Sequence, residues 1–369
     1  MKFRGSGQPT VGLEMEFQLL DGQTLNLANG ILPLMRQYPD EVCIKPEMNQ
    51  ATVEVNTSIC GNTQELEQSF VSCVSRLREQ CRDTGLILCG AGTHPFCKRL
   101  ARITPLPRYR DQAKVAGYLS HIMVTYGMHV HVGMASGDEA VHVMGRLKPY
   151  LPLLLALSAS SPFWRGRESG YASYRQRVLA SMRSYGIPPL FADWQDYARF
   201  FSVARRAGVF KTARDVHWDL RFQPELGTLE IRVMDAQPGI REAICLAAFA
   251  YILATYLKRA DAEEDRRRLV PLHWWMQKEN FFRASRSGME TQLIVDERGS
   301  LRPMRRVFED TLEMTAPTAA ELGEQQRLVV LEQSLAAGPS YVRQRQAYAK
   351  TGSIRDVVTL LVEELQQQA

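Results

Sequence analysis

Two glutamates lie two residues apart in the stretch PTVGLEMEFQLLD, which runs from Pro9 to Asp21. Polar and apolar residues alternate along it with the period of two that is typical of a β-strand with one buried face. Glu14 and Glu16 are therefore expected to project from the same face of the strand. Unpaired carboxylates held this close repel each other, and a bound cation would relieve the repulsion.

The same alternation recurs three times further along the chain. ATVEVNT carries Glu54 and Asn56, YGMHVHVGM carries two histidines, and GTLEIRVMD carries a glutamate and an arginine. In each stretch one alternate set is apolar, which predicts that this set packs on a core while the other forms an ionisable face. The ionisable residues of the last two stretches are His129, His131, Glu230 and Arg232.

Taken singly, each pair has an ordinary structural explanation: a solvated outer face, hydrogen-bonded histidines, or a surface ion pair that contributes little. Together they are harder to explain in this way, because the four pairs contain no lysine. If the four strands share one sheet, their carboxylates converge. Hard oxygen ligands with one or two imidazoles suit Mg²⁺ or Mn²⁺ better than Zn²⁺.

A magnesium ion held by a few carboxylates usually serves the phosphates of a nucleotide. Arg232 would then supply a planar cation beside a transferring phosphoryl group. The chain contains neither a Gly-x-x-x-x-Gly-Lys-Ser/Thr loop nor a Gly-x-Gly-x-x-Gly turn. A nucleotide is therefore expected to bind on the sheet itself, in a site for phosphoryl chemistry.

The composition is globular: 369 residues are 45% hydrophobic and 23% charged, with a net charge of +5. The positive excess suits an anionic small substrate, and its densest cluster, Asp265 to Arg268, is interpreted as a solvated helix end or loop. The most apolar run, near Leu151 to Ala159, is far shorter than the ~20 residues of a membrane span. With no signal-peptide pattern and no Cys-x-x-Cys among seven cysteines, we expect a cytoplasmic protein with reduced, mostly buried thiols.

Helices are expected between these strands. A capping box of Asn62 and Glu65 opens a helix that ends near Asp83, and a buried strand, GLILCGAG, follows it. Such irregular alternation, without a βαβ rhythm, favours an α+β fold with an antiparallel sheet. Residues 1–369 are expected to form a single catalytic domain whose C-terminal third is mainly helical. The other predicted helices span about 108–126, 138–160, 240–260 and 354–367.

Five motifs, in order, resemble the bacterial carboxylate–amine ligases of the glutamate–cysteine ligase type 2 family. They are VGLEMEFQLLD, GTHPF, YGMHVHVGM, LSASSPFWRGRESGYASYR and GTLEIRVMDAQ, and the likeness continues through ENFFRASRSGM and YVRQRQAY. The resemblance implies the catalytic fold of glutamine synthetase. That fold has a curved antiparallel sheet of about six strands, with helices on its convex face and ATP and metals on its concave face.

The resemblance also implies roles for single residues. Glu230 would hold the metal under the β- and γ-phosphates, and Arg232 would steady the γ-phosphoryl group. His129 would contact a metal or the phosphates, with His131 beside it. Arg175 and Arg221 would clamp a substrate carboxylate or a phosphate, although a structural salt bridge explains each of them equally well. The full set of implied metal ligands is Glu14, Glu16, Glu47, Glu54, His129 and Glu230.

The chain departs from the family pattern at three places. Glu168-Ser169-Gly170 stands where Asp-Thr-Gly is frequent, and Arg221-Phe222-Gln223 stands where Arg-Pro-His is frequent. Met15 stands where a second acid is usual after Gly-x-Glu, but alternation points it to the core side, away from the metals. The departure at Phe222 and Gln223 bears on the identity of the substrate more than on the chemistry.

The expected reaction is ATP-dependent amide formation through an acyl phosphate, with Mg²⁺ or Mn²⁺. The γ-carboxylate of glutamate would attack the γ-phosphate, and an amine such as cysteine would then displace phosphate. The substrates would be small molecules, without nucleic acid or membrane, and the sequence is compatible with a homo-oligomer. The rivals are a guanidino-kinase-like phosphotransferase with a related sheet, a catalytically silent nucleotide- and metal-binding homologue, and a zinc hydrolase. The chain lacks the His-Glu-x-x-His helix that would support a zinc hydrolase.

Overall fold

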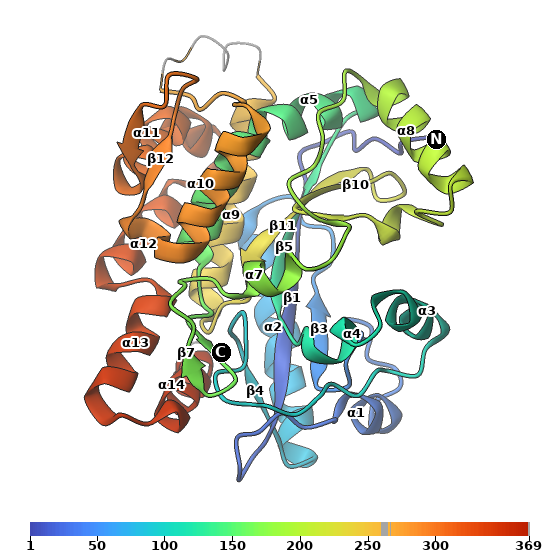
Figure 1. Cartoon of the computed structure of the whole chain (residues 1–369), viewed down its shortest axis with the longest axis vertical. Helices are drawn as coiled ribbons and strands as arrows, with labels where there is room; N and C mark the ends of the chain where they lie inside the picture. Colours follow the sequence, from blue (N-terminus) through green and yellow to red (C-terminus); the bar gives the residue numbers. More distant parts are fainter. Residues whose placement is uncertain (260–264, 266, 368–369) are drawn as a thin grey trace.

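A seven-stranded antiparallel sheet forms the centre of the computed structural model (Figure 1), which describes residues 1–259, 265 and 267–367. Six strands lie in the order β10–β11–β5–β1–β3–β2, and β4 pairs with the last residues of β1. The predicted α+β class is confirmed, and the sheet has one strand more than the six expected. The bounds are Val11–Asp21 (β1), Ile44–Pro46 (β2), Thr52–Asn56 (β3), Leu86–Cys89 (β4), Gly127–Gly133 (β5), Leu220–Gln223 (β10) and Thr228–Asp235 (β11).

One face of this sheet is apolar and packs on helices. The alternate residues Met15, Phe17 and Val55 of β1 and β3 are fully buried where α2 (Thr63–Asp83) packs on these strands, and α9 (Ile240–Leu257) packs on the neighbouring β5. Burial of each such side chain contributes roughly 1.5–3 kcal/mol to stability. A one-residue slip of any strand would turn its apolar residues outward, so this core fixes the register of the opposite, polar face.

The start of α2 confirms the predicted cap. The side chain of Asn62 accepts a hydrogen bond from the backbone N–H of Glu65 at 2.9 Å. Glu65 accepts the N–H of Gly61, the residue before the cap, at 2.8 Å, so the second bond of the predicted capping box comes from one residue earlier than expected. The bond to Asn62 satisfies a backbone donor that the first turn of a helix leaves free.

α9 is the most apolar helix of the core. It is long and apolar enough to cross a membrane, but 83% of it is buried inside the protein, where it lies against β5, α2 and the C-terminal helices. Full burial in a protein core explains a helix that is apolar on all sides. The helix ends at Leu257, and residue 260, its predicted end, lies outside the described residues.

The C-terminal third is helical, as predicted, and Figure 1 shows it in orange and red along one side of the sheet. α14 begins and ends at the predicted residues, and its Val358 and Leu361 pack with Leu20. The elements are α10 (Trp274–Ser287), β12 (Gln292–Ile294), β13 (Leu301–Pro303), α11 (Met304–Leu322), α12 (Gln325–Ala337), α13 (Ser340–Thr351) and α14 (Ile354–Gln367).

The predicted helix over 108–126 is wrong in its second half. α3 (Pro107–Ala116) ends at Gly117, whose φ of 58° lies in the left-handed region that glycine adopts without strain. One further turn, α4 (Leu119–Ile122), follows before an extended segment leads into β5. A glycine inside a helical pattern is therefore a stop signal here.

The predicted helix over 138–160 is interrupted in its middle and ends two residues early. α5 (Gly137–Leu147) and α6 (Leu151–Ser158) are joined by a 3-10 turn over Lys148–Tyr150. Pro149 lies in that turn, and its ring cannot donate the hydrogen bond that a continuous α-helix requires. The remaining elements are α1 (Ile31–Gln37), β6 (Phe163–Trp164), β7 (Arg167–Glu168), α7 (Arg175–Leu179), β8 (Tyr185–Gly186), α8 (Trp194–Arg206) and β9 (His217–Trp218).

All seven cysteines are buried and free, as the composition predicted. In the basic cluster after α9, the guanidinium of Arg267 pairs with Asp265 at 2.7 Å, while Arg266 lies outside the described residues.

The motif GTHPF folds into a loop that His94 holds together. Its ring is buried and accepts the backbone N–H groups of Phe96 and Cys97 at Nδ1, at 3.2 and 2.9 Å. Nε2 lies 2.9 Å from the carbonyl oxygen of Leu25, so Nε2 carries the proton of a neutral imidazole. Burial lowers the pKa of His94 to about 4, although the bond to Leu25 opposes the shift.

This histidine should make stability depend on pH. In the unfolded chain its pKa is about 6.5, so the unfolded state binds the proton first as the pH falls. The free energy of unfolding should therefore decrease between about pH 7 and pH 4, by at most roughly 3 kcal/mol from this residue. Urea unfolding at pH 7, 6 and 5 should show a shallower decrease for His94→Gln than for the natural protein. Parallel pH profiles would contradict the assignment.

Candidate active site

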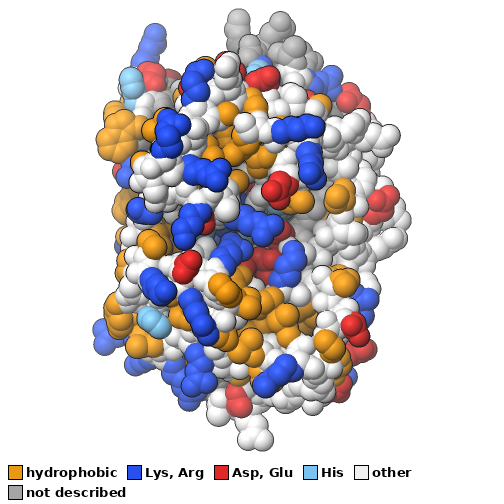
Figure 2. Space-filling model, turned by 90° about the vertical axis from the view of Figure 1, so that its right-hand side faces the viewer, with side chains coloured by type: hydrophobic (Ala, Val, Ile, Leu, Met, Phe, Trp, Pro, Cys, Tyr) orange, Lys and Arg blue, Asp and Glu red, His pale blue; other side chains and the backbone are white. Residues whose placement is uncertain are grey.

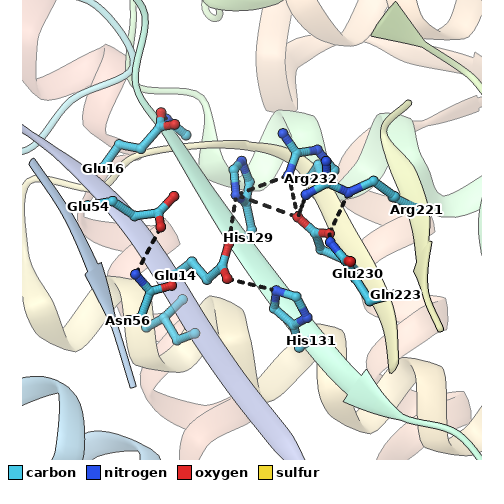
Figure 3. A network of polar contacts seen from close by, with 12 residues as sticks. Glu14, Glu16, Glu54, Asn56, His129, His131, Arg221, Gln223, Glu230 and Arg232 are labelled. Atoms are coloured by element: carbon cyan, nitrogen blue, oxygen red, sulfur yellow. Dashed lines mark hydrogen bonds and ion pairs between the residues drawn. The ribbon is translucent and has the colours of Figure 1, made fainter. Parts of the chain in front are cut away.

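The polar face of the sheet gathers the predicted residues (Figure 3). In the β1–β3 register Glu16 lies opposite Glu54, and in the β1–β5 register Glu14 lies opposite His129. On β11, Glu230 lies opposite His131. The convergence that the alternation predicted is therefore confirmed.

One half of this face is a carboxylate group formed by Glu16, Glu47 and Glu54. Each of the three offers an oxygen within 4.8 Å of the others. Glu47 joins the two strand residues because it follows β2, which pairs with β3. These oxygens accept hydrogen bonds from neutral donors: the N–H of Gly127 reaches Glu16 at 2.5 Å, and the amide of Asn56 reaches Glu54 at 2.9 Å. Glu47 accepts the N–H of Met48 at 3.1 Å and the hydroxyl of Tyr109 at 3.4 Å.

Burial and mutual repulsion disfavour the charged forms of these acids. Burial and the charge of Glu47 raise the pKa of Glu16 to about 7, although Arg175 opposes the shift. Burial, with the charges of Glu47 and Glu14, raises the pKa of Glu54 well above its ordinary value. Burial also raises the pKa of Glu47. Carboxylate oxygens that lack enough positively charged partners are ligands that suit a divalent metal ion.

Glu14 joins the carboxylate group to the two histidines. Its oxygens lie 3.5 Å from Nδ1 of His129 and 3.3 Å from Nε2 of His131. Burial opposes ionisation of Glu14, but the charge of His131 and hydrogen bonds to both rings outweigh it and lower the pKa. Two further sets of residues could hold a cation: Glu14 with Glu54 and His129, and Glu14 with His131 and Glu230.

His129 is a neutral imidazole. Burial and the nearby charge of Arg232 lower its pKa to about 4. Nη1 of Arg232 lies 3.4 Å from Nδ1 of His129, the same nitrogen that faces Glu14. His131 differs, since the charge of Glu14 overcomes burial and raises its pKa.

The other half of the face is built around the fully buried Glu230. Arg221 binds it through two parallel bonds, from Nε at 2.8 Å and Nη2 at 2.9 Å, and Gln223 donates to it at 2.6 Å. Nη1 of Arg232 also donates to this carboxylate. Burial alone would raise the pKa of Glu230, but Arg221 and Arg232 hold it well below its usual range. Arg221 was expected to act either as an anion clamp or in a structural salt bridge, and the structure contains the salt bridge.

A β-bulge sets the position of Arg232. Ile231 pairs with Val130 and Met234 pairs with Met128, so two residues of β11 face the single residue His129. Bulges of this kind redirect a side chain and are frequent beside active sites. The backbone N–H of Arg232 is instead bonded to the carbonyl of Asp219, at 2.8 Å.

Side chains of α7 support the bulge through hydrogen bonds. Arg175 donates to the carbonyl oxygens of Val233 and Arg232 at 3.3 and 3.4 Å, and Gln176 donates to that of Val233 at 2.8 Å. Arg175 also lies 3.9 Å from Asp235, which three serine groups hold in place. Both predicted anion clamps thus make contacts within the protein, and their contact with a substrate stays a prediction.

Two site residues, Gln176 and Asp219, escaped the sequence analysis, as did the contact of Gln223 with Glu230. Gln223 had a signal, since alternation from Arg221 places it on the same face. Asp219 continues that row in the other direction and is buried, with Gln176 3.4 Å away. No signal in the sequence indicated the role of Gln176, because that role depends on a bulge in a distant strand.

A hollow opens on one side of the molecule. Figure 2 shows Asp and Glu side chains at the bottom of this hollow and Lys and Arg side chains around it. Such a rim attracts anionic ligands, while the acids within attract cations.

Comparison with known proteins agrees with this geometry. Residues 10–360 match the model of glutamate-cysteine ligase family 2. A protein provisionally named glutamate–cysteine ligase 2 from Trichormus variabilis is 48% identical over 369 residues, covering 100% of this chain and 95% of that protein. A protein of the same provisional name from Gloeobacter violaceus is 37% identical, covering 96% of each chain.

Two solved structures share the fold. The glutamate–cysteine ligase of Francisella tularensis, solved in complex with AMP, has a TM-score of 0.65 and 11% identity, covering 99% of this chain and 90% of that one. The bifunctional glutathione synthetase of Pasteurella multocida has a TM-score of 0.70 and 13% identity. It covers 98% of this chain, which spans about half (52%) of that protein. From the match over 351 of its residues and these relatives, the chain belongs to glutamate-cysteine ligase family 2.

Proposed function

We propose that this protein joins the γ-carboxylate of glutamate to an amine such as cysteine, with release of ADP and phosphate. Membership in the family makes the chain an ATP-dependent ligase that forms a C–N bond. The observation that supports the reaction most directly is the meeting of two unlike groups on one sheet face. An undercompensated set of carboxylates lies beside an arginine whose position a bulge fixes.

The family implies ATP and a divalent metal, and the donor set fits Mg²⁺ or Mn²⁺. We assign Glu16, Glu47 and Glu54 to one cation and Glu14 with a histidine to another. When bound, such cations neutralise the charge on the nucleotide phosphates. Neutral His129 can serve as a ligand without first losing a proton. Glu230 is kept as a ligand in this proposal, although its oxygens already bind Arg221 and Arg232.

Arg232 is assigned to the transferring phosphoryl group. Glu230 holds one end of its guanidinium, and its Nε is buried without a hydrogen-bond partner among the described residues. A donor held in advance where charge develops lowers the barrier more than a donor that must first be oriented. Attack by the substrate carboxylate would form the acyl phosphate here, and the amine would then displace phosphate.

The substrates are small molecules, in keeping with the family. We further propose that the described chain acts as one catalytic domain in the cytoplasm.

A product assay tests the proposal and separates its rivals. The protein is incubated with Mg²⁺, ATP and glutamate across a panel of amines, and released phosphate and product mass are measured. A ligase gives phosphate and an amide only when both carboxylate and amine are present. A guanidino-kinase-like enzyme would give a stable phosphorylated product without the amide. A silent homologue would bind Mg²⁺-ATP and release nothing, and either result would overturn the proposal.

The assignment of the metal ligands can be tested through thermal unfolding, without measuring turnover. Glu16→Gln and Glu54→Gln each remove one repelling charge, so the metal-free variants should unfold at the same temperature as the natural protein or higher. A metal at 100 times its Kd stabilises a protein by about 2.7 kcal/mol, and each variant should lose most of this gain. Turnover should be abolished in both.

Glu242→Gln is the matched control for these variants. Glu242 is an acid on α9 that pairs with Arg343 at 2.8 Å, away from the polar face. Its loss should lower the unfolding temperature at every metal concentration while the gain on adding metal stays. An undiminished gain in the Glu16 and Glu54 variants would remove these residues from the metal site.

Arg232→Lys should lower kcat on the order of 10²-fold, with a smaller effect on the KM for ATP, because lysine keeps the charge but loses the planar fork. Arg232→Ala should be more impaired. Arg343→Lys makes the same change at an arginine that pairs with Glu242 and Glu364, and its activity should follow the folded fraction. An increased KM with unchanged kcat in Arg232→Lys would show a binding contact instead.

A further inference from the structure

Gly127, the first residue of β5, lies on the polar face of the sheet. It belongs to the same alternate row as His129 and His131, it pairs with Asp235 of β11, and it donates its N–H to Glu16. Glycine within a strand is less favourable than alanine, because it loses more conformational freedom on folding. The backbone here does not require glycine, since the φ of Gly127 is not positive. The reason for a glycine at this position must therefore lie in the space around it.

Two functional side chains fill the space that a side chain at residue 127 would need. A Cβ atom added to Gly127 would overlap Nη2 of Arg175, and it would lie 3.1 Å from Cζ of that guanidinium and 2.9 Å from Nε2 of His129. Cβ atoms in folded proteins do not approach other atoms this closely, so one side of each contact would have to move. Both neighbours are the far ends of side chains, whereas the ladder of the sheet holds the backbone of β5. The guanidinium and the imidazole would therefore move.

These two neighbours of Gly127 both hold Arg232. The guanidinium of Arg175 donates to the carbonyl oxygens of Arg232 and Val233, at 3.4 and 3.3 Å, and so fixes the backbone of the bulge. The ring of His129 lies beside the other end of the residue, with Nδ1 3.4 Å from Nη1 of Arg232 (Figure 3). A side chain at residue 127 would thus disturb both the backbone and the guanidinium of Arg232.

This crowding is not a general property of the glycines on the polar face. Gly12 lies on β1 opposite His131, in the same alternate row as Glu14. A Cβ atom at Gly12 would lie 3.6 Å from Cβ of His131 and 3.9 Å from Oγ1 of Thr57, which are ordinary van der Waals contacts. The φ of Gly12 is not positive either. Gly12 can therefore be replaced by alanine without displacing a neighbour.

We propose that Gly127 is a positioning residue for phosphoryl transfer. The absence of a side chain at this position lets Arg175 and His129 occupy the places from which they hold Arg232. Gly127 acts only through these neighbours and is not assigned a contact with a substrate or a metal. This inference rests on the proposed ligase function, because it gives Gly127 an effect on the residue that was assigned to the transferring phosphoryl group.

Gly127→Ala tests this role, with Gly12→Ala as the matched control. Turnover is measured as the hydroxamate formed from glutamate, Mg²⁺-ATP and hydroxylamine, per folded molecule. We expect kcat of Gly127→Ala to fall about 10- to 100-fold, with a smaller effect on the KM for ATP, because a misplacement of about 1 Å can cost a factor of this size. Its unfolding temperature should stay close to that of the natural protein. Gly12→Ala should match the natural protein in kcat and in KM.

A double-mutant cycle with Arg175→Ala shows whether Gly127 acts through its neighbour. Arg175→Ala releases the bulge and should itself lower kcat. Adding Gly127→Ala should then lower kcat by less than about 3-fold, because the guanidinium that alanine would displace is gone, whereas independent sites would give multiplied effects. Stability gives a second measure. In the Arg175→Ala background, alanine at residue 127 should raise the unfolding temperature more than it does in the natural protein, since a strand favours alanine over glycine.

The outcomes distinguish this inference from the proposed function. If the natural protein forms no hydroxamate, the ligase proposal fails and this inference fails with it. If the natural protein is active and Gly127→Ala has the same kcat, only the inference is wrong. Fully multiplied effects in the double variant would overturn it as well. A Gly127→Ala protein that unfolds, and that Arg175→Ala does not rescue, would show that the glycine serves the backbone of the strand and would also overturn it.

Discussion

Repulsion among buried carboxylates is the constraint on which the rest of this structure depends. Glu14, Glu16, Glu47 and Glu54 are held together by strand register, and burial makes their charged forms costly. The two histidines offset this cost at Glu14, whereas the cost at Glu16, Glu47 and Glu54 is not fully offset. The stability that permits it comes from the opposite face, where Phe17 and its apolar neighbours pack beneath two helices. The same register that buries the core therefore also holds the acids together.

Period-two alternation was enough to predict which residues share the polar face. It could not predict which strands are neighbours, and the convergence of Glu54 with Glu16 became certain only from the pairing of β1 with β3. The cap at Asn62 and the span of α14 followed from local signals. Gly117 and Pro149 are visible in the sequence, but the helical periodicity of their neighbours continues across the breaks that they introduce.

The bulge in β11 is the feature that the sequence could not reveal. GTLEIRVMD reads as an unbroken strand, yet one extra residue beside His129 shifts the register. Its unpaired carbonyls are satisfied by Arg175 and Gln176, which lie more than 50 residues earlier in the chain. Arg175 was expected either to bind an anion or to form a structural salt bridge, and the structure shows it supporting the strand that carries Arg232. A residue that fixes the position of a catalytic group can thus resemble a ligand-binding residue in the sequence.

The order of the strands divides the chemistry of the site. β1 and β3 bring acids that suit cations, β10 and β11 bring arginines that suit phosphate, and β5 lies between them with two histidines in different states. Glu230 belongs to the arginine side, because Arg221 binds it through two parallel bonds in a buried setting. Removal of Arg221 would take away one of the two arginines that compensate the buried charge of Glu230, which is costlier than the loss of a surface pair. Arg221 and Glu230 therefore act as a foundation for Arg232, and the guanidinium of Arg232 is oriented before any substrate arrives.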